Sequence, residues 1–312
     1  MGTLVEIIVH ESNEKLAQNA INKSFNEISR LEKIMSTYLS NSELSKFNKL
    51  AKNKSSIPVS HDLLKVIKRG VYWGKLSNGA IDISIGPAVK LWDFNSEKPT
   101  LPSIDKIRNA TNYINYENII VDKNSVNLKK LGMSLHLGSI GKGYAVDQAI
   151  NILKNEGIKS GLVNAGGDLV TFGLKSNNKP WSIGIQHPRK PEKIILSLDI
   201  KDKAMATSGD YQKYFMENKV RHHHILDPKS GWPQSHTMSA TVIAETAMDA
   251  DALSTALFIL GDAKGISLIN SIKGVEGMII SSKGSASYSS GFINLPGLSL
   301  EKLKETILKN KN

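Results

Sequence analysis

The irregular order of helical and strand-like segments constrains the fold of this chain most. Helical periodicity covers 13–35 and 61–78, and further helices are expected at 144–155, 247–260, 263–271 and 299–310. Short strand-like runs lie between them, at 3–9, 117–122, 125–129, 133–137, 161–164, 169–173, 181–186, 194–200, 221–226, 238–244 and 277–281. Because strands and helices do not alternate strictly, the pattern favours an α+β fold over a doubly wound parallel sheet.

Two stretches in the first third of the chain interrupt this pattern. The stretch 79–94 mixes apolar residues with Asp82, Gly86 and Pro87, and we predict a loop or short strand there. The stretch 99–102 begins and ends with proline, which makes it the best candidate for a linker. No fixed-period repeat is present. A chain of 312 residues can bury a large core without a disulfide or a structural metal.

Composition narrows the classes of function. The net charge is +11, but the lysines are scattered and form no basic arm, so we expect a solvated basic surface and no nucleic-acid site. The chain has no cysteine, which excludes thiolate metal sites and cysteine nucleophiles. No unbroken run of about 18 apolar residues occurs, so we expect no membrane span. An apolar run begins as early as Leu4, and we expect that a leader was removed ahead of it.

Two glycine-rich segments follow expected strands. Gly138-Ser139-Ile140-Gly141-Lys142-Gly143 lies between a strand and a helix, where free N–H groups and a lysine suit a bound phosphate. Its spacing matches neither common nucleotide-binding fingerprint, and a tight turn explains it equally well. The second segment, 164–168, holds Gly166 and Gly167, which permit close approach to a ligand, although a simple turn needs them too.

Two further segments carry metal-binding or acid–base side chains. Asp251 and Thr255 are four residues apart and share a helix face, so their oxygens can converge on Mg²⁺; an acidic helix N-terminus is the alternative. Three histidines stand at 222–224, but neighbours on a strand point to opposite faces, which argues against zinc. One of them could be a general base, or the group could be a surface cluster without a role.

Asp82 is the last candidate from the residues alone. It lies among apolar residues, and a buried carboxylate needs a hydrogen-bonding partner. A ligand group or a neighbouring backbone could supply that partner.

The order of these segments resembles the ApbE family of FAD:protein FMN transferases. The likeness runs from Met1 to about residue 281, and its nine segments occur in the family's order. They are MGT, MSTY, SELSKFN, GAIDISIGPAVKLWDF, LGSIGKGYAVD, NAGGD, ATSGDYQKYF, HHILDPKSG and ADALSTALFILG. The resemblance implies a T-fold-related α+β architecture with antiparallel-rich sheets and flanking helices. It implies one domain over 1–312, either undivided or formed of two lobes with the FAD site between them.

The resemblance also implies roles for individual residues. His224 would be the base for the acceptor hydroxyl. Asp251 and Thr255 would hold Mg²⁺ through their side chains, and Ser139 would do so through its carbonyl. The FAD site would be lined by Met1, Tyr38, Ala80, Ile81, Asp82, His136, Lys142, Gly166, Gly167 and Ile225. Two positions depart from the family pattern: His136 stands where the family usually has Asp, and Gly141 where it often has Ala.

The activity implied is Mg²⁺-dependent transfer of FMN from FAD to a Thr or Ser hydroxyl of an acceptor flavoprotein, with release of AMP. Such acceptors are often subunits of membrane redox pumps or reductases. Hydrolysis of FAD to FMN and AMP is the alternative in the same site, and non-catalytic FAD binding is a third hypothesis that His136 favours. Relatives work in the periplasm or on the outer face of the cytoplasmic membrane, so we expect peripheral membrane association through a removed leader or lipid anchor.

Overall fold

The computed structural model describes residues 2–51, 56–175 and 177–298. These residues form two compact units, each assembled from separate stretches of the chain. The first unit contains 29–141 and 212–234, and the second contains 2–28, 142–211 and 235–298. The expected helix at 299–310 lies outside the described residues.

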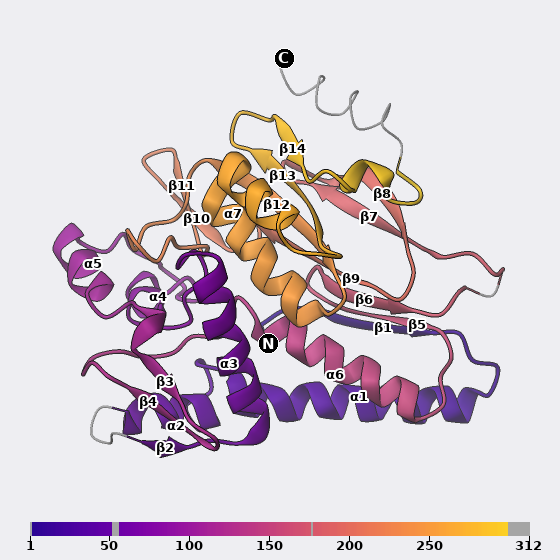
Figure 1. Cartoon of the computed structure of the whole chain (residues 1–312), viewed down its shortest axis with the longest axis horizontal. Helices are drawn as coiled ribbons and strands as arrows, with labels where there is room; N and C mark the ends of the chain where they lie inside the picture. The colour runs from indigo at the N-terminus through magenta and orange to yellow at the C-terminus, as the bar shows by residue number, and fades with distance from the viewer. Residues whose placement is uncertain (1, 52–55, 176, 299–312) are drawn as a thin grey trace. The chain divides into compact units, whose positions relative to one another are not determined.

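The second unit is built on a seven-stranded sheet in which all neighbouring strands are antiparallel (Figure 1). The order is β1-β5-β6-β9-β12-β13-β14. The bounds are β1 (Val5–Val9), β5 (Gly161–Ala165), β6 (Asp168–Phe172), β9 (Ala204–Gly209), β12 (Thr237–Ala244), β13 (Glu276–Ser281) and β14 (Ala286–Tyr288). The antiparallel pairing confirms the α+β expectation.

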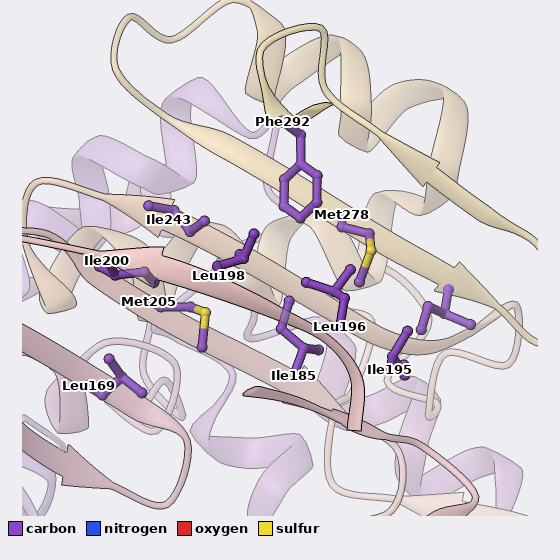
Figure 2. Close-up of a cluster of buried hydrophobic side chains, with 11 residues drawn as sticks. Leu169, Ile185, Ile195, Leu196, Leu198, Ile200, Met205, Ile243, Met278 and Phe292 are labelled. Atoms are coloured by element: carbon purple, nitrogen blue, oxygen red, sulfur yellow. The ribbon is translucent and has the colours of Figure 1, made fainter. Parts of the chain in front are cut away.

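Different elements cover the two faces of this sheet. Helix α7 (Ala247–Asn270) packs on β9, β12 and β13. The hairpin of β7 (Trp181–His187) and β8 (Lys190–Ile200) packs on the sheet through a buried apolar cluster (Figure 2). On β9, Met205 belongs to that cluster whereas Ser208 bonds to α7, so the hairpin and the helix lie on opposite faces. Helix α6 (Gly141–Asn155) and α1 (Glu14–Met35) are joined by the hydroxyl of Ser24, which donates to the carbonyl of Ala149.

The range of α7 contains the two expected helices, separated at Gly261. Gly261 interrupts it with a φ of 75°, which marks the kink between the two expected segments. By length and composition alone α7 is long and apolar enough to cross a membrane, although it contains no unbroken apolar run of about 18 residues. Its side chains Leu253, Leu257 and Phe258 are fully buried, as in the core helix of a folded unit.

The first unit consists of short helices, a small sheet and a hairpin. The helices are α2 (Glu43–Leu50), α3 (His61–Leu76), α4 (Gly86–Trp92), α5 (Ile104–Thr111) and the 3-10 turn η1 (Tyr116–Asn118). The sheet has the order β2-β4-β3, formed by β2 (Ile57–Pro58), β4 (Ser125–Leu128) and β3 (Ile119–Val121). The hairpin joins β10 (Tyr214–Glu217) to β11 (Val220–His223). A second 3-10 turn, η2 (Phe292–Asn294), belongs to the second unit.

Three expectations for the first unit were wrong. The stretch 79–94 contains α4, because Pro87 in the first helical turn needs no N–H partner. The stretch 133–137 is not a strand: only Ser134 forms an isolated bridge, to Ile85, while Leu135 is held by the side chain of Asn48. The stretch 99–102 lies between α4 and α5 of the same unit, so it does not link two units.

Candidate functional site

The start of α6 approaches the start of α7 within the second unit. A Cβ atom on Gly143 would lie 2.1 Å from the carbonyl oxygen of Ala247, so only glycine permits this approach. The N–H of Gly143 donates to Oδ2 of Asp251 at 3.1 Å. Asp147 accepts hydrogen bonds from the N–H groups of Ala247 and Met248 at 2.8 and 2.9 Å. Side chains of both helices thereby satisfy the amide groups that helix N-termini leave unpaired.

Lys142 lies between two buried carboxylates. Its Nζ pairs with Asp168, whose side chain is 2% exposed, and lies 3.4 Å from Oδ1 of Asp251, whose side chain is 3% exposed. Burial lowers the pKa of Lys142, but the charges of the two carboxylates outweigh that effect and raise it. Burial, followed by the neighbouring charge of Asp251, raises the pKa of Asp168 to about 7 despite Lys142. Two carboxylates that share one lysine therefore have capacity for a further cation.

Thr255 lies on the same face of α7 as Asp251, as the four-residue spacing predicts. Its hydroxyl donates to the backbone carbonyl of Asp251 at 3.2 Å and lies 3.2 Å from the hydroxyl of Ser208 on β9. The described residues contain no group of three His, Cys, Asp or Glu side chains placed to hold a metal. Carboxylate and hydroxyl oxygens nevertheless fit Mg²⁺, which takes one or two carboxylates and keeps several waters.

The glycines of the second segment are explained by a tight turn between β5 and β6. Gly166 and Gly167 have φ angles of 63° and 98°, and the N–H of Gly167 donates to Oδ1 of Asn164. A Cβ atom on Gly166 would lie 2.1 Å from the hydroxyl of Thr3. Their approach to a cofactor stays a prediction. The turn places Asp168 beside Lys142. Asp168 belongs to the segment 164–168 considered in the sequence, but this ion pair was not predicted.

In the first unit Lys213 joins several of the expected site residues. Its Nζ lies 5.9 Å from the ring centre of Tyr38 and 3.1 Å from Oδ1 of Asn95. The residue Tyr38 is 62% exposed, and its ring meets the His136 ring edge-on at 6.2 Å. A role for Lys213 was not predicted from the sequence. Its position in the ATSGDYQKYF segment is the one sequence feature that distinguishes it from other lysines.

His136 is held in its neutral form. Burial, and to a lesser degree the charge of Lys213, lowers the pKa of His136 to about 4. The N–H of Gly138 donates to Nδ1 of His136 at 3.2 Å. The proton of the neutral ring is therefore on Nε2, which makes that nitrogen a hydrogen-bond donor. An aspartate at this position would offer only acceptors when ionised.

His224 is held by the backbone of Lys213. The carbonyl of Lys213 accepts from the N–H of His224 at 3.1 Å and lies 3.3 Å from its Nδ1. Because a carbonyl cannot donate, Nδ1 carries the proton and Nε2 is the basic nitrogen of the neutral ring. The neighbouring histidines have other partners: His223 is buried against the carbonyl of Gln234, and His222 stacks on Trp92. The three rings therefore contact three different groups of the first unit.

The Ala80-Ile81-Asp82 triplet lies in the interior of the first unit. Ala80 and Ile81 are 4% and 1% exposed, and Ile225, another residue expected to line the FAD site, is also buried. Asp82 accepts from the N–H and hydroxyl of Ser84 and from the N–H of Tyr116, at 2.6 to 2.8 Å. Burial raises the pKa of Asp82, and these bonds oppose the effect. Neighbouring groups of the chain thus satisfy this carboxylate.

The structure therefore assembles the expected residues in two sets, one in each unit. In the second unit, Asp251 contacts both Lys142 and Thr255. In the first unit, Tyr38 contacts His136, and Lys213 contacts both Tyr38 and His224. Ser139 is partly buried in the first unit, and Met1 lies outside the described residues. The assignment of these residues to FAD and Mg²⁺ stays a prediction.

Solved structures share this fold. The crystal structure of the ApbE protein of Thermotoga maritima matches with a TM-score of 0.87 and 33% identity, covering 93% of this chain and 95% of that protein. The apo form of the flavinyl transferase ApbE of Pseudomonas stutzeri matches with a TM-score of 0.84 and 30% identity, covering 96% and 95% of the two chains. The chain therefore has the fold of the flavin transferases.

Sequence relatives specify the family. The model of the ApbE family matches residues 1–279. The FAD:protein FMN transferase of Haemophilus influenzae is 34% identical over 284 residues, which cover 87% of this chain and 80% of the relative. The chain belongs to the ApbE family, which confirms the resemblance drawn from its nine segments.

Proposed function

We propose that this chain transfers the FMN half of FAD to a Thr or Ser hydroxyl of an acceptor flavoprotein, with Mg²⁺ and with release of AMP. The names of the relatives support the transfer of FMN from FAD to a protein. The observation that carries the metal-assisted form is the buried pair of Asp168 and Asp251 around Lys142. A phosphate-bearing substrate with a hard cation suits such a cluster of carboxylates and ammonium.

The residues of the proposed site have two roles: one accepts a proton, and the others bind the substrate and the metal. Nε2 of His224 takes the proton of the acceptor hydroxyl, whose oxygen forms a bond to the phosphorus of the FMN half. The bond from that phosphorus to the bridging oxygen breaks, and AMP leaves with the electron pair. Lys142 supplies positive charge to the pyrophosphate. The side chains of Asp251 and Thr255 and the carbonyl of Ser139 would hold Mg²⁺, which when bound neutralises phosphate charge.

The products distinguish transfer from hydrolysis. The chain would be mixed with FAD, Mg²⁺ and an apo acceptor flavoprotein, and flavin fluorescence on a denaturing gel compared with AMP release. Fluorescence on the acceptor band with an equal amount of AMP is expected. AMP without a fluorescent acceptor would instead identify FAD hydrolysis, with water replacing the hydroxyl. Intact FAD in the presence of Mg²⁺ would leave FAD binding alone.

We also propose that the chain works in the periplasm or on the outer face of the cytoplasmic membrane, held peripherally by a leader or lipid anchor. The family resemblance supports this location. Fractionation of cells that express the full-length gene tests it, and recovery of the chain with the cytoplasmic proteins would contradict it.

A further inference from the structure

Among the described residues, no third strand pairs with the outer edge of β10 in the β10–β11 hairpin of the first unit. Its two-residue turn, Asn218-Lys219, has φ angles of 50° and 65°, so Glu217 and Val220 pair next to the turn. The N–H of His224 donates to the carbonyl of Lys213 at the other end. Bonded pairs alternate with non-bonded pairs in an antiparallel ladder, so the backbone groups of Tyr214 and Met216 point away from β11. No described residue bonds to them.

Two side chains of this edge strand are apolar and exposed. Tyr214 and Met216 are 45% and 55% exposed, whereas Phe215 between them packs on Trp92, at a ring distance of 6.3 Å. Folded proteins usually protect such an edge with charges, a proline or a covering element, because an open apolar edge pairs with other chains. The outward backbone groups and the two apolar side chains of β10 offer a further strand hydrogen bonds and contact area.

The charge around the open edge is positive. Lys213, Lys219 and Arg221 carry positive charges along the hairpin, against one negative charge, on Glu217. The guanidinium of Arg221 lies over the ring of Tyr214 at 4.2 Å, on the exposed face. An occupant with acidic side chains would complement this surface.

We propose that β10 is the docking edge for the acceptor protein, which adds an extended segment with acidic and apolar side chains as a new strand. This proposal rests on the proposed function. One end of a strand paired with Tyr214 and Met216 would lie beside Lys213, the residue that precedes β10. The carbonyl of Lys213 is also the hydrogen-bonding partner of His224. The docked segment is thereby led toward the residue assigned as the base, and its backbone bonds give affinity without demanding one particular sequence.

Backbone and charge variants test the docking edge separately from the chemistry. Met216→Pro removes the outward N–H, and Met216→Ala is its matched control because it loses the same side chain but keeps that donor. The KM for an acceptor that the native chain flavinylates is expected to rise about three- to tenfold more for the proline variant, the effect of one lost hydrogen bond. The affinity for FAD, followed by its fluorescence, is expected to stay unchanged in both.

Charge reversal gives a second test that does not disturb the strand. Lys219→Glu is expected to raise the acceptor KM and to weaken its dependence on salt, while Lys106→Glu, an exposed charge on α5, leaves both unchanged. Hydrogen exchange at the amides of Tyr214 and Met216 is expected to slow when the acceptor binds. Equal KM values for all four variants, or protection confined to other elements, would overturn the docking edge and leave the transferase intact. Absence of any labelled acceptor with the native chain would overturn the proposed function, and the docking edge with it.

Discussion

His136 should make the unfolding free energy of the chain depend on pH. Its pKa falls from 6.5 to about 4 on folding, so between these values the unfolded chain binds more protons than the folded chain. The unfolding free energy should therefore decrease as the pH falls from 6.5 to about 4, and His136 should change it little at lower pH. For the native chain we expect a loss of about 1 to 3 kcal/mol between pH 7 and pH 4 from this residue.

His136→Gln measures that contribution directly. Denaturant unfolding at pH 7 and pH 4.5 would be compared for the two chains, so that the other titrating groups, common to both, cancel. A smaller decrease for the glutamine variant is expected. The same decrease in both chains would show that His136 is protonated in the folded state.

Asp251 tests the metal assignment. Asp251→Asn removes one charged oxygen ligand, and we expect FAD turnover at limiting Mg²⁺ to fall by more than about tenfold. Asp249→Asn is the matched control, because it removes an equal charge from the first turn of the same helix. Turnover would be measured over a series of Mg²⁺ concentrations. Equal losses in both variants would favour the alternative in which these carboxylates only stabilise the helix N-terminus.

At the residue scale, spacing predicted neighbours within an element but not between elements. The four-residue spacing placed Asp251 and Thr255 on one face of α7, as found. The contact of Lys142 with Asp168 joins the start of α6 to β6, across 26 positions of sequence. Periodicity carries no information about such a contact. For Asp82 the sequence left two partners open, and only the fold identified Ser84 and Tyr116.

At the element scale, the junction of α6 and α7 depends on a missing side chain. Gly143→Ala would place a Cβ atom 2.1 Å from the carbonyl of Ala247, which forces the two helix starts apart. We expect a loss of about 1 to 3 kcal/mol of unfolding free energy, as for other overpacked sites, and weaker binding of Mg²⁺ because Asp251 bonds to the same glycine.

Gly141→Ala is the control for this prediction. The nearest atoms to its added Cβ lie at 3.6 and 3.7 Å, which is ordinary contact, so this variant should be as stable as the native chain or more so. Unfolding by denaturant, followed by circular dichroism, compares the two variants. Equal stability of both would show that the helix starts can separate at little cost.

Elements with strong periodicity were predicted well, and those defined by tertiary contacts were not. Helix α1 and the strands β1, β5, β6, β12 and β13 follow from their apolar patterns, whereas β9 and β14 of the same sheet were not predicted. Helix α4 is only seven residues long, and its Gly-Pro start reads locally as a turn. The stretch 133–137 has the apolar alternation of a strand, but the amide of Asn48 takes the backbone groups that a neighbouring strand would use.

At the scale of the whole molecule, each unit draws on stretches that are far apart in sequence. The first unit combines 29–141 with 212–234, and its apolar cluster joins Trp92 and Ile107 to Leu226. Nε1 of Trp92 donates to the carbonyl of Gly231 at 2.8 Å. The position of a linker cannot predict this division into two units, because neither unit is one continuous segment of the chain.

The first unit should consequently need its second stretch in order to fold. A fragment of residues 29–141 exposes the face of Trp92 that Leu226 and Gly231 cover, whereas the same fragment joined to 212–234 by a flexible Gly/Ser linker of about 20 residues restores that contact. We expect the joined fragment to unfold cooperatively in denaturant, at a higher midpoint than 29–141 alone, as followed by tryptophan fluorescence. A joined fragment with 212–234 in scrambled order should behave as 29–141 does, since the composition is kept and the packing is lost. If the scrambled and native joins unfold alike, the stretch 212–234 contributes little to the first unit, and the hairpin with His224 is held mainly by other parts of the chain.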